Sequence, residues 1–160
     1  MPDDLHQRDL VLWSADQAEK LRRLSSGEQA NDIDWPNLVI EVADLGISET
    51  KAVRKLLLRA LERLLRVIAF PAAPDHRSWL HEANVFLRDA RLDWTPGMDR
   101  LIDLPELYAL ACETVRDLSC REGPAADLPA CCPVGLRDLL PAEKHAFARA
   151  DGLIKSFQAA

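Results

Sequence analysis

Two stretches of the chain carry the residue types best suited to chemistry. The first holds Glu41, a carboxylate inside an apolar run, and the second holds His81 close to Trp79. Carboxylate and imidazole groups are common general acids and bases, so Glu41 and His81 are the candidate catalytic residues. A binding site in the same region would combine carboxylate, guanidinium and indole groups. Its candidate residues are Trp35, Glu41, Arg66, Arg77 and Trp79.

The sequence lacks the usual patterns of metal-binding and cofactor-binding sites. The histidines are His6, His76, His81 and His145, and no two of them have the spacing that places two ligands on one helix face. Neither a Cys-x-x-Cys pair, a Gly-x-Ser-x-Gly elbow nor a phosphate-binding glycine loop occurs. We therefore expect no metal and no cofactor, and free thiols at Cys112, Cys120, Cys131 and Cys132.

The elements that must position these residues are helices. Ser14, with Gln17 three residues later, is typical of a capping box and predicts a first helix from about Ala15 to Leu24. Later helices are predicted at about 75–93 and 103–118, then near Leu136 and from Pro141 onward, with a loop at 123–133. No strand-like alternation is present. We predict an all-α bundle of about five to seven helices, mostly antiparallel neighbours, in a single domain over residues 1–160.

The other segments of the chain are arranged around the stretch from Asp34 to Phe70. Trp35-Pro36 predicts a helix start, and Gly46 can adopt the left-handed conformation that would end this helix. Ser48 then predicts the start of a second helix of about twenty residues, which stops before Pro71.

This second helix has an apolar side and a basic side. The basic side contains six cations against the single acid Glu62, a local charge of +5 in a chain of −6, so the remainder carries −11. Excess acid elsewhere can supply counter-charges, and we expect internal neutralisation. Nucleic-acid binding through this stripe is an alternative. The stripe comprises Lys51, Arg54, Lys55, Arg59, Arg63 and Arg66.

Composition and patterning also bear on location and partners. A chain of 160 residues with 48% hydrophobic side chains can form one core. Lys and Arg interrupt its most apolar stretch, so no membrane span is expected. The first eight residues lack the basic and apolar regions of a signal peptide, which favours a cytoplasmic location. The wide apolar stripe through Leu80 and Leu87 predicts a homodimer interface.

Several short motifs follow one another along the chain: Asp9 to Trp13, Gln17-Ala18, Asp34-Trp35-Pro36-Asn37-Leu38, Glu41, Leu45-Gly46, Ser78-Trp79 and Cys132-Pro133. As a set they resemble the domain of unknown function 29 family. The resemblance covers about residues 5–141 and leaves 142–160 as a C-terminal helical extension. It implies an all-helical bacterial protein without an assigned activity.

The chain departs from that family at polar positions. Glu41 is the acid that remains of an acidic trio, Leu80 stands where an arginine is usual, and Arg66 stands where a histidine is usual. The resemblance therefore implies that this chain has kept fewer polar groups than its relatives.

Three functional hypotheses follow. The preferred one is a non-enzymatic protein-interaction or regulatory module, because no catalytic constellation is present in the sequence. The first alternative is a small enzyme or anion-binding protein with a site around Glu41, Arg66 and Trp79, in which Arg77 and His81 also take part. The second is nucleic-acid binding through Lys51 to Arg66.

Overall fold

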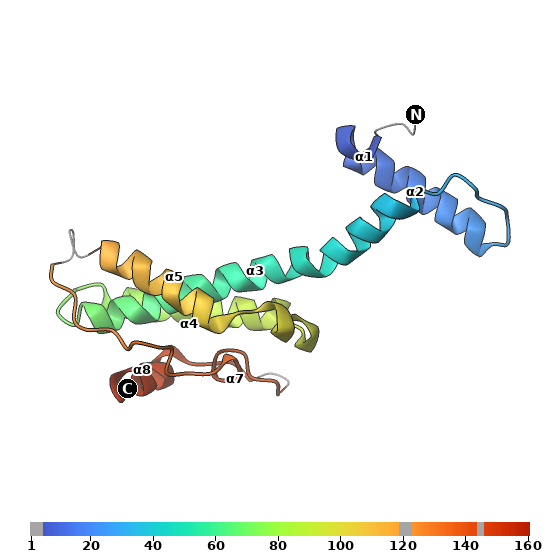
Figure 1. Cartoon of the computed structure of the whole chain (residues 1–160). Helices are drawn as coiled ribbons and strands as arrows, with labels where there is room; N and C mark the ends of the chain where they lie inside the picture. The colour runs from blue at the N-terminus through green and yellow to red at the C-terminus, as the bar shows by residue number, and fades with distance from the viewer. Residues whose placement is uncertain (1–4, 119–122, 144–145) are drawn as a thin grey trace. The chain divides into compact units, whose positions relative to one another are not determined.

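The computed structural model describes residues 5–118, 123–143 and 146–160, so Cys120 and His145 lie outside the described residues. In this part of the chain every regular element is helical, which confirms the all-α prediction, with a count slightly above the expected range (Figure 1). The chain forms two compact units, Met1–Gly46 and Ile47–Ala160. The elements are α1 (Leu5–Arg8), α2 (Leu10–Ser25), α3 (Trp35–Ala69), α4 (His76–Asp93), the 3-10 helix η1 (Pro96–Leu101), α5 (Leu104–Asp117), α7 (Leu136–Leu139) and α8 (Ala150–Gln158).

The predicted capping box at Ser14 is wrong. Helix α2 begins at Leu10, and its cap is Asp9, whose side chain accepts a hydrogen bond from the backbone N–H of Leu12 at 2.9 Å. Aspartate accepts such bonds as well as serine does. Gln17 is then free for another role inside the helix. The predicted end is confirmed, because Gly27 follows α2 with a φ of 89°, which suits glycine.

The predicted break at Gly46 is also wrong. Helix α3 runs without interruption from Trp35 to Ala69, so Gly46 and Ser48 are helix-interior residues. Glycine inside a helix costs about 1 kcal/mol relative to alanine but does not forbid the helix. The strong helix formers that follow Ser48 allow the helix to continue past Gly46. The predicted end before Pro71 is confirmed.

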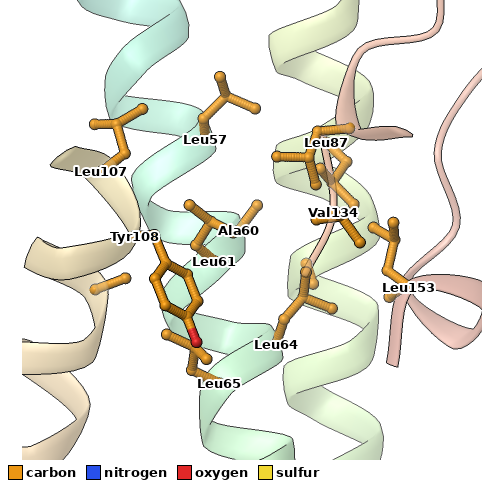
Figure 2. Packing of buried hydrophobic residues seen from close by; sticks show 14 of the residues in the cluster. Leu57, Ala60, Leu61, Leu64, Leu65, Leu87, Leu107, Tyr108, Val134 and Leu153 are labelled. Atoms are coloured by element: carbon orange, nitrogen blue, oxygen red, sulfur yellow. The ribbon is translucent and has the colours of Figure 1, made fainter. Parts of the chain in front are cut away.

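The core of the second unit is built around the later part of α3. Figure 2 shows α3 side chains between those of α4 and α5, with Val134 and Leu153 at one side. Leu57, Leu61 and Leu64 are completely buried. The apolar side predicted for this helix is therefore confirmed as a core face.

The predicted homodimer face on α4 is wrong in its location. Leu87 is 0% exposed and belongs to the core cluster, and Leu80 is partly buried and packs against that cluster. Sequence periodicity identifies an apolar stripe but does not distinguish core from interface. Here the stripe is used inside the chain.

The C-terminal segments pack on this core. The 123–133 segment is a loop as predicted, and the N–H of Ala126 donates to the carbonyl of Ala69 at 2.7 Å. The last helix begins at Ala150 rather than at Pro141. The N–H of Ala150 donates to Oδ1 of Asn84 on α4 at 2.9 Å, and Phe157 is buried. Helix α8 thus docks on α4.

Among the described residues, no helix combines the length and the apolar character that crossing a membrane requires.

Candidate functional site

Asp34, directly before α3, is the centre of a polar cluster in the first unit. Its Oδ2 accepts hydrogen bonds from Nε1 of Trp13 at 3.1 Å and from Nδ2 of Asn37 at 2.8 Å. Its backbone N–H donates to Oε1 of Gln17 at 2.8 Å. The amide of Asn37, and then the indole of Trp13, lower the pKa of the Asp34 carboxyl against the opposing effect of desolvation. Asp34 is therefore held as a carboxylate between α2 and α3.

Glu41, one turn beyond Asn37 in α3, pairs with a histidine that the sequence interpretation left aside. Oε1 of Glu41 lies 2.6 Å from Nε2 of His6 on α1. The His6 ring meets Trp13 edge-on, with ring centroids 4.7 Å apart. The carboxylate inside an apolar run thus serves to fix α1 to α3.

A hollow of about 650 Å³ lies beside this cluster, within the same unit. Nζ of Lys20 lies 2.8 Å from Oδ2 of Asp16 and 3.2 Å from Oδ2 of Asp32. The hydrogen bond that Lys20 donates to Asp16, and after it the bond donated to Asp32, raises the pKa of Lys20 against the effect of desolvation. The bond from Lys20 also lowers the pKa of Asp32. The hollow is lined by Leu5, Trp13, Asp16, Gln17, Lys20, Asp32, Ile33, Asp34 and Pro36.

The side chains of this cluster form hydrogen bonds and ion pairs with one another. A histidine–carboxylate pair such as His6 and Glu41 can orient a general base, yet both groups here connect helices of one unit. The ammonium group of Lys20 is likewise paired with two carboxylates of the same unit. In the described part of the chain, no group of three His, Cys, Asp or Glu side chains could hold a metal ion. What the arrangement does is fasten α1 and α2 to the start of α3.

Sequence reasoning missed the partners in this cluster. His6, Trp13 and Gln17 lie far along the chain from the residues that they contact, and no local pattern pairs them. Trp13 and Gln17 belong to the family motif set, whose first four motifs converge here, so that set could have found these two, whereas His6 lies outside it. Those motifs therefore have a structural role.

The other predicted site residues lie in the second unit. Trp79 is buried, and the Arg66 guanidinium lies 6.0 Å from its ring centroid. Arg77 and His81 are exposed on α4. His81 lines a shallow hollow of about 470 Å³ together with Arg88 and Arg149. Glu41 and Trp35 belong to the first unit, so their convergence with this group stays a prediction.

The basic stripe is partly neutralised inside the second unit, as expected. Arg54 pairs with Glu106 at 2.7 Å, and Arg63 pairs with Glu82. The bond from Arg63 is the largest cause that lowers the pKa of Glu82. Arg59 lies over the Phe86 ring, 5.8 Å from its centroid. With Arg66 over the Trp79 ring, four of the six cations thus contact a carboxylate or an aromatic ring within the second unit.

Three cysteines gather around a pocket of about 360 Å³ between α5 and the following loop. Cys112 is buried, Cys131 is exposed and Cys132 is half-buried, and all three are free thiols. Burial raises the pKa of Cys132. The Tyr108 hydroxyl donates to the carbonyl of Pro129 at 2.7 Å, and burial raises the pKa of this phenol as well. The raised pKa values favour the protonated, less reactive forms of Cys132 and Tyr108.

Comparisons with known proteins agree with this fold. A crystal structure of an α-helical protein of unknown function from Rhodospirillum rubrum ATCC 11170 is similar, with a TM-score of 0.68 and 24% sequence identity, over 94% of this chain and 95% of that one. A search of curated proteins finds no match. The family described as domain of unknown function DUF29 matches residues 5–143. Because this match covers most of the chain, the protein belongs to the DUF29 family, whose function is not assigned.

Proposed function

We propose that this chain is a non-enzymatic protein-interaction module, and that its contact surface is the apolar face of α3, defined as Trp35, Val39, Val42 and Leu45. The observation that carries the proposal is the exposure of these four side chains. Their exposed fractions are 51%, 65%, 67% and 63%, respectively.

The polar cluster explains why this face points away from the unit's own helices. Asn37 and Glu41 lie on the side of α3 that is bonded to Asp34 and His6. At 100° per residue, Trp35, Val39 and Val42 lie on the opposite side of the helix, and Leu45 lies at the edge of the apolar face nearest Glu41. The first unit therefore uses the polar side of its longest helix internally and leaves the apolar side outside.

This surface differs from the scattered apolar residues found on any protein. Single exposed leucines and valines are ordinary, whereas a contiguous apolar patch rimmed by polar residues marks an interaction site. The four residues follow one another at spacings of three and four, so they form one stripe along the helix. The neighbouring Ile40 is also about half exposed.

The polar cluster supports a non-enzymatic role. Its strongest acid–base pair, Glu41 with His6, is bonded internally at 2.6 Å. An interaction module requires a rigid helix that presents a stripe, and the bonds around Asp34 supply that rigidity at the helix start. A cytoplasmic location and a bacterial source, expected from the sequence, remain predictions.

Photo-crosslinking in living cells tests the proposal. A photoreactive phenylalanine analogue at position 42 is expected to give a crosslinked species heavier than the 17.9 kDa chain. The same analogue at position 44, which is exposed on the polar side of α3, is the matched control and should give little product. The crosslink at 42 should disappear when Val39→Asp is added. No crosslink at 42, or equal crosslinks at 42 and 44, would contradict the proposal.

A further inference from the structure

We propose that the hollow between α4 and the start of α8 binds an organic phosphate, in which a phosphate monoester is joined to an aromatic ring. This is the hollow of about 470 Å³ that His81, Arg88 and Arg149 line. It lies in the second unit, so the inference does not depend on the contact surface proposed for α3. Three observations carry it: the polar groups in the lining, the elements that position them, and an exposed aromatic ring beside them.

Every polar side chain that lines this hollow carries hydrogen-bond donors. Arg88 and Arg149 are permanent cations, and each can bind a phosphate through two parallel hydrogen bonds. His81 adds a ring N–H, and Asn84 adds an amide NH₂ group. None of the described residues in the lining is a carboxylate, although the chain has 26 acidic residues against 20 lysines and arginines. The lining therefore favours an anion.

Two elements hold these donors around one space. His81, Asn84 and Arg88 are separated by three and four residues, so they lie on one face of α4. Arg149 is the residue directly before α8. The N–H of Ala150 donates to Oδ1 of Asn84 at 2.9 Å, which fixes the start of α8 beside this face. Because Oδ1 accepts this bond, the two N–H groups on Nδ2 of Asn84 remain for a ligand.

The acidic neighbours of the two arginines hold them loosely. Nε of Arg88 lies 3.5 Å from Oδ1 of Asp89, and Nη2 of Arg149 lies 3.9 Å from Oδ2 of Asp151. All four side chains are largely exposed, and surface ion pairs of this kind contribute little to stability. A phosphate monoester carries about two negative charges and three acceptor oxygens at neutral pH, so it can compete with either carboxylate.

An apolar wall beside the donors indicates what the phosphate is attached to. Phe147 lines the hollow and is 41% exposed, and Val85 and Ala148 extend the same wall. A flat ring stacked on Phe147 would cover this exposed surface while its phosphate contacts the arginines. The volume of about 470 Å³ falls within the range of small-molecule sites, about 300–1,000 Å³.

Isothermal titration of the full chain at low ionic strength tests the inference, with phenyl phosphate as the probe. Phenyl phosphate should bind more tightly than inorganic phosphate, and phenol should not bind. Raising the salt concentration from about 20 mM to about 200 mM should weaken the binding several-fold, because the charges are exposed and become screened. No saturable binding up to about 10 mM phenyl phosphate would overturn the inference.

Two further probes distinguish the sources of such a ligand. Adenosine 5′-monophosphate represents a free nucleotide, and O-phosphotyrosine represents a phosphorylated side chain. The source is the class that binds more tightly than inorganic phosphate. If neither does, the ring has no role and the proposed ligand class is wrong.

Charge reversal locates the site. Arg88→Glu and Arg149→Glu should each weaken phenyl phosphate binding at least tenfold, because each removes a bidentate contact and adds a repelling carboxylate. Arg100→Glu is the matched control: it makes the same charge change at an exposed residue of η1 that does not line the hollow, and it should leave the affinity nearly unchanged. Phe147→Ala should reduce the affinity for phenyl phosphate to that for inorganic phosphate.

The variants also give the results that would contradict the site. Equal losses in Arg88→Glu, Arg149→Glu and Arg100→Glu would mean that overall charge alone attracts the anion. Full affinity in Arg88→Glu or in Arg149→Glu would place the binding elsewhere. Far-UV circular dichroism should show unchanged helical content in these variants, because the three arginines are exposed.

Discussion

Leu87 provides the sharpest test of the fold, because the sequence stripe and the structure give it different roles. Its side chain is 0% exposed, in the core between α4 and α3. Removing three carbon atoms at such a site costs the transfer free energy plus the cavity that remains. We expect Leu87→Ala to lower the free energy of unfolding of the second unit by about 2–5 kcal/mol.

Leu92→Ala on the same helix is the control, since the chemical change is identical and this side chain is 67% exposed. It should change the free energy of unfolding by less than about 0.5 kcal/mol. Urea denaturation, followed by circular dichroism and by tryptophan fluorescence, measures both variants. If Leu87→Ala and Leu92→Ala had equal small effects on unfolding, while Leu87→Ala shifted the oligomeric state, the assignment of Leu87 to the core would be refuted.

Three further predictions concern the second unit. Arg63 lowers the pKa of Glu82, so the ion pair stabilises the fold fully above the ordinary glutamate pKa of 4.5. This stabilisation is lost as the pH falls through the lowered pKa. Thermal melts in acid should therefore show no destabilisation by Arg63→Met. Tyr108→Phe, which removes the hydrogen bond from this hydroxyl to the loop, should lower the free energy of unfolding by about 1 kcal/mol in urea. Cys131, which is exposed, should react with iodoacetamide before the buried Cys112, as peptide mass spectrometry would show; the reverse order would contradict the packing of this loop.

Much of the second unit follows from its sequence. The apolar side of α3 after residue 53, the extent of α4 and the loop at 123–133 agree with local pattern and punctuation. Such features depend on helical periodicity and on proline, which act over a few residues. The sequence could not show that Leu87 belongs to the core, because a core and an interface impose the same pattern on a helix.

The first unit was harder to predict because its signals are either ambiguous or long-range. Gly46 can end a helix or lie inside one, and the residues after it decided the outcome. The bond between His6 and Glu41 joins residues 35 positions apart, and that between Trp13 and Asp34 joins residues 21 positions apart. Tertiary folding brings these pairs together, so no local spacing reveals them. Because these bonds occupy one side of α3, the other side of the helix is left exposed.

The central claim is that α3 presents an apolar face to a protein partner. The most direct measurement is in-cell photo-crosslinking from position 42, with position 44 on the polar side of the same helix as the reference. Our account predicts a crosslinked product at 42 that Val39→Asp abolishes, and little product at 44. A chain that remains uncrosslinked at 42, or that crosslinks equally at both positions, would contradict it.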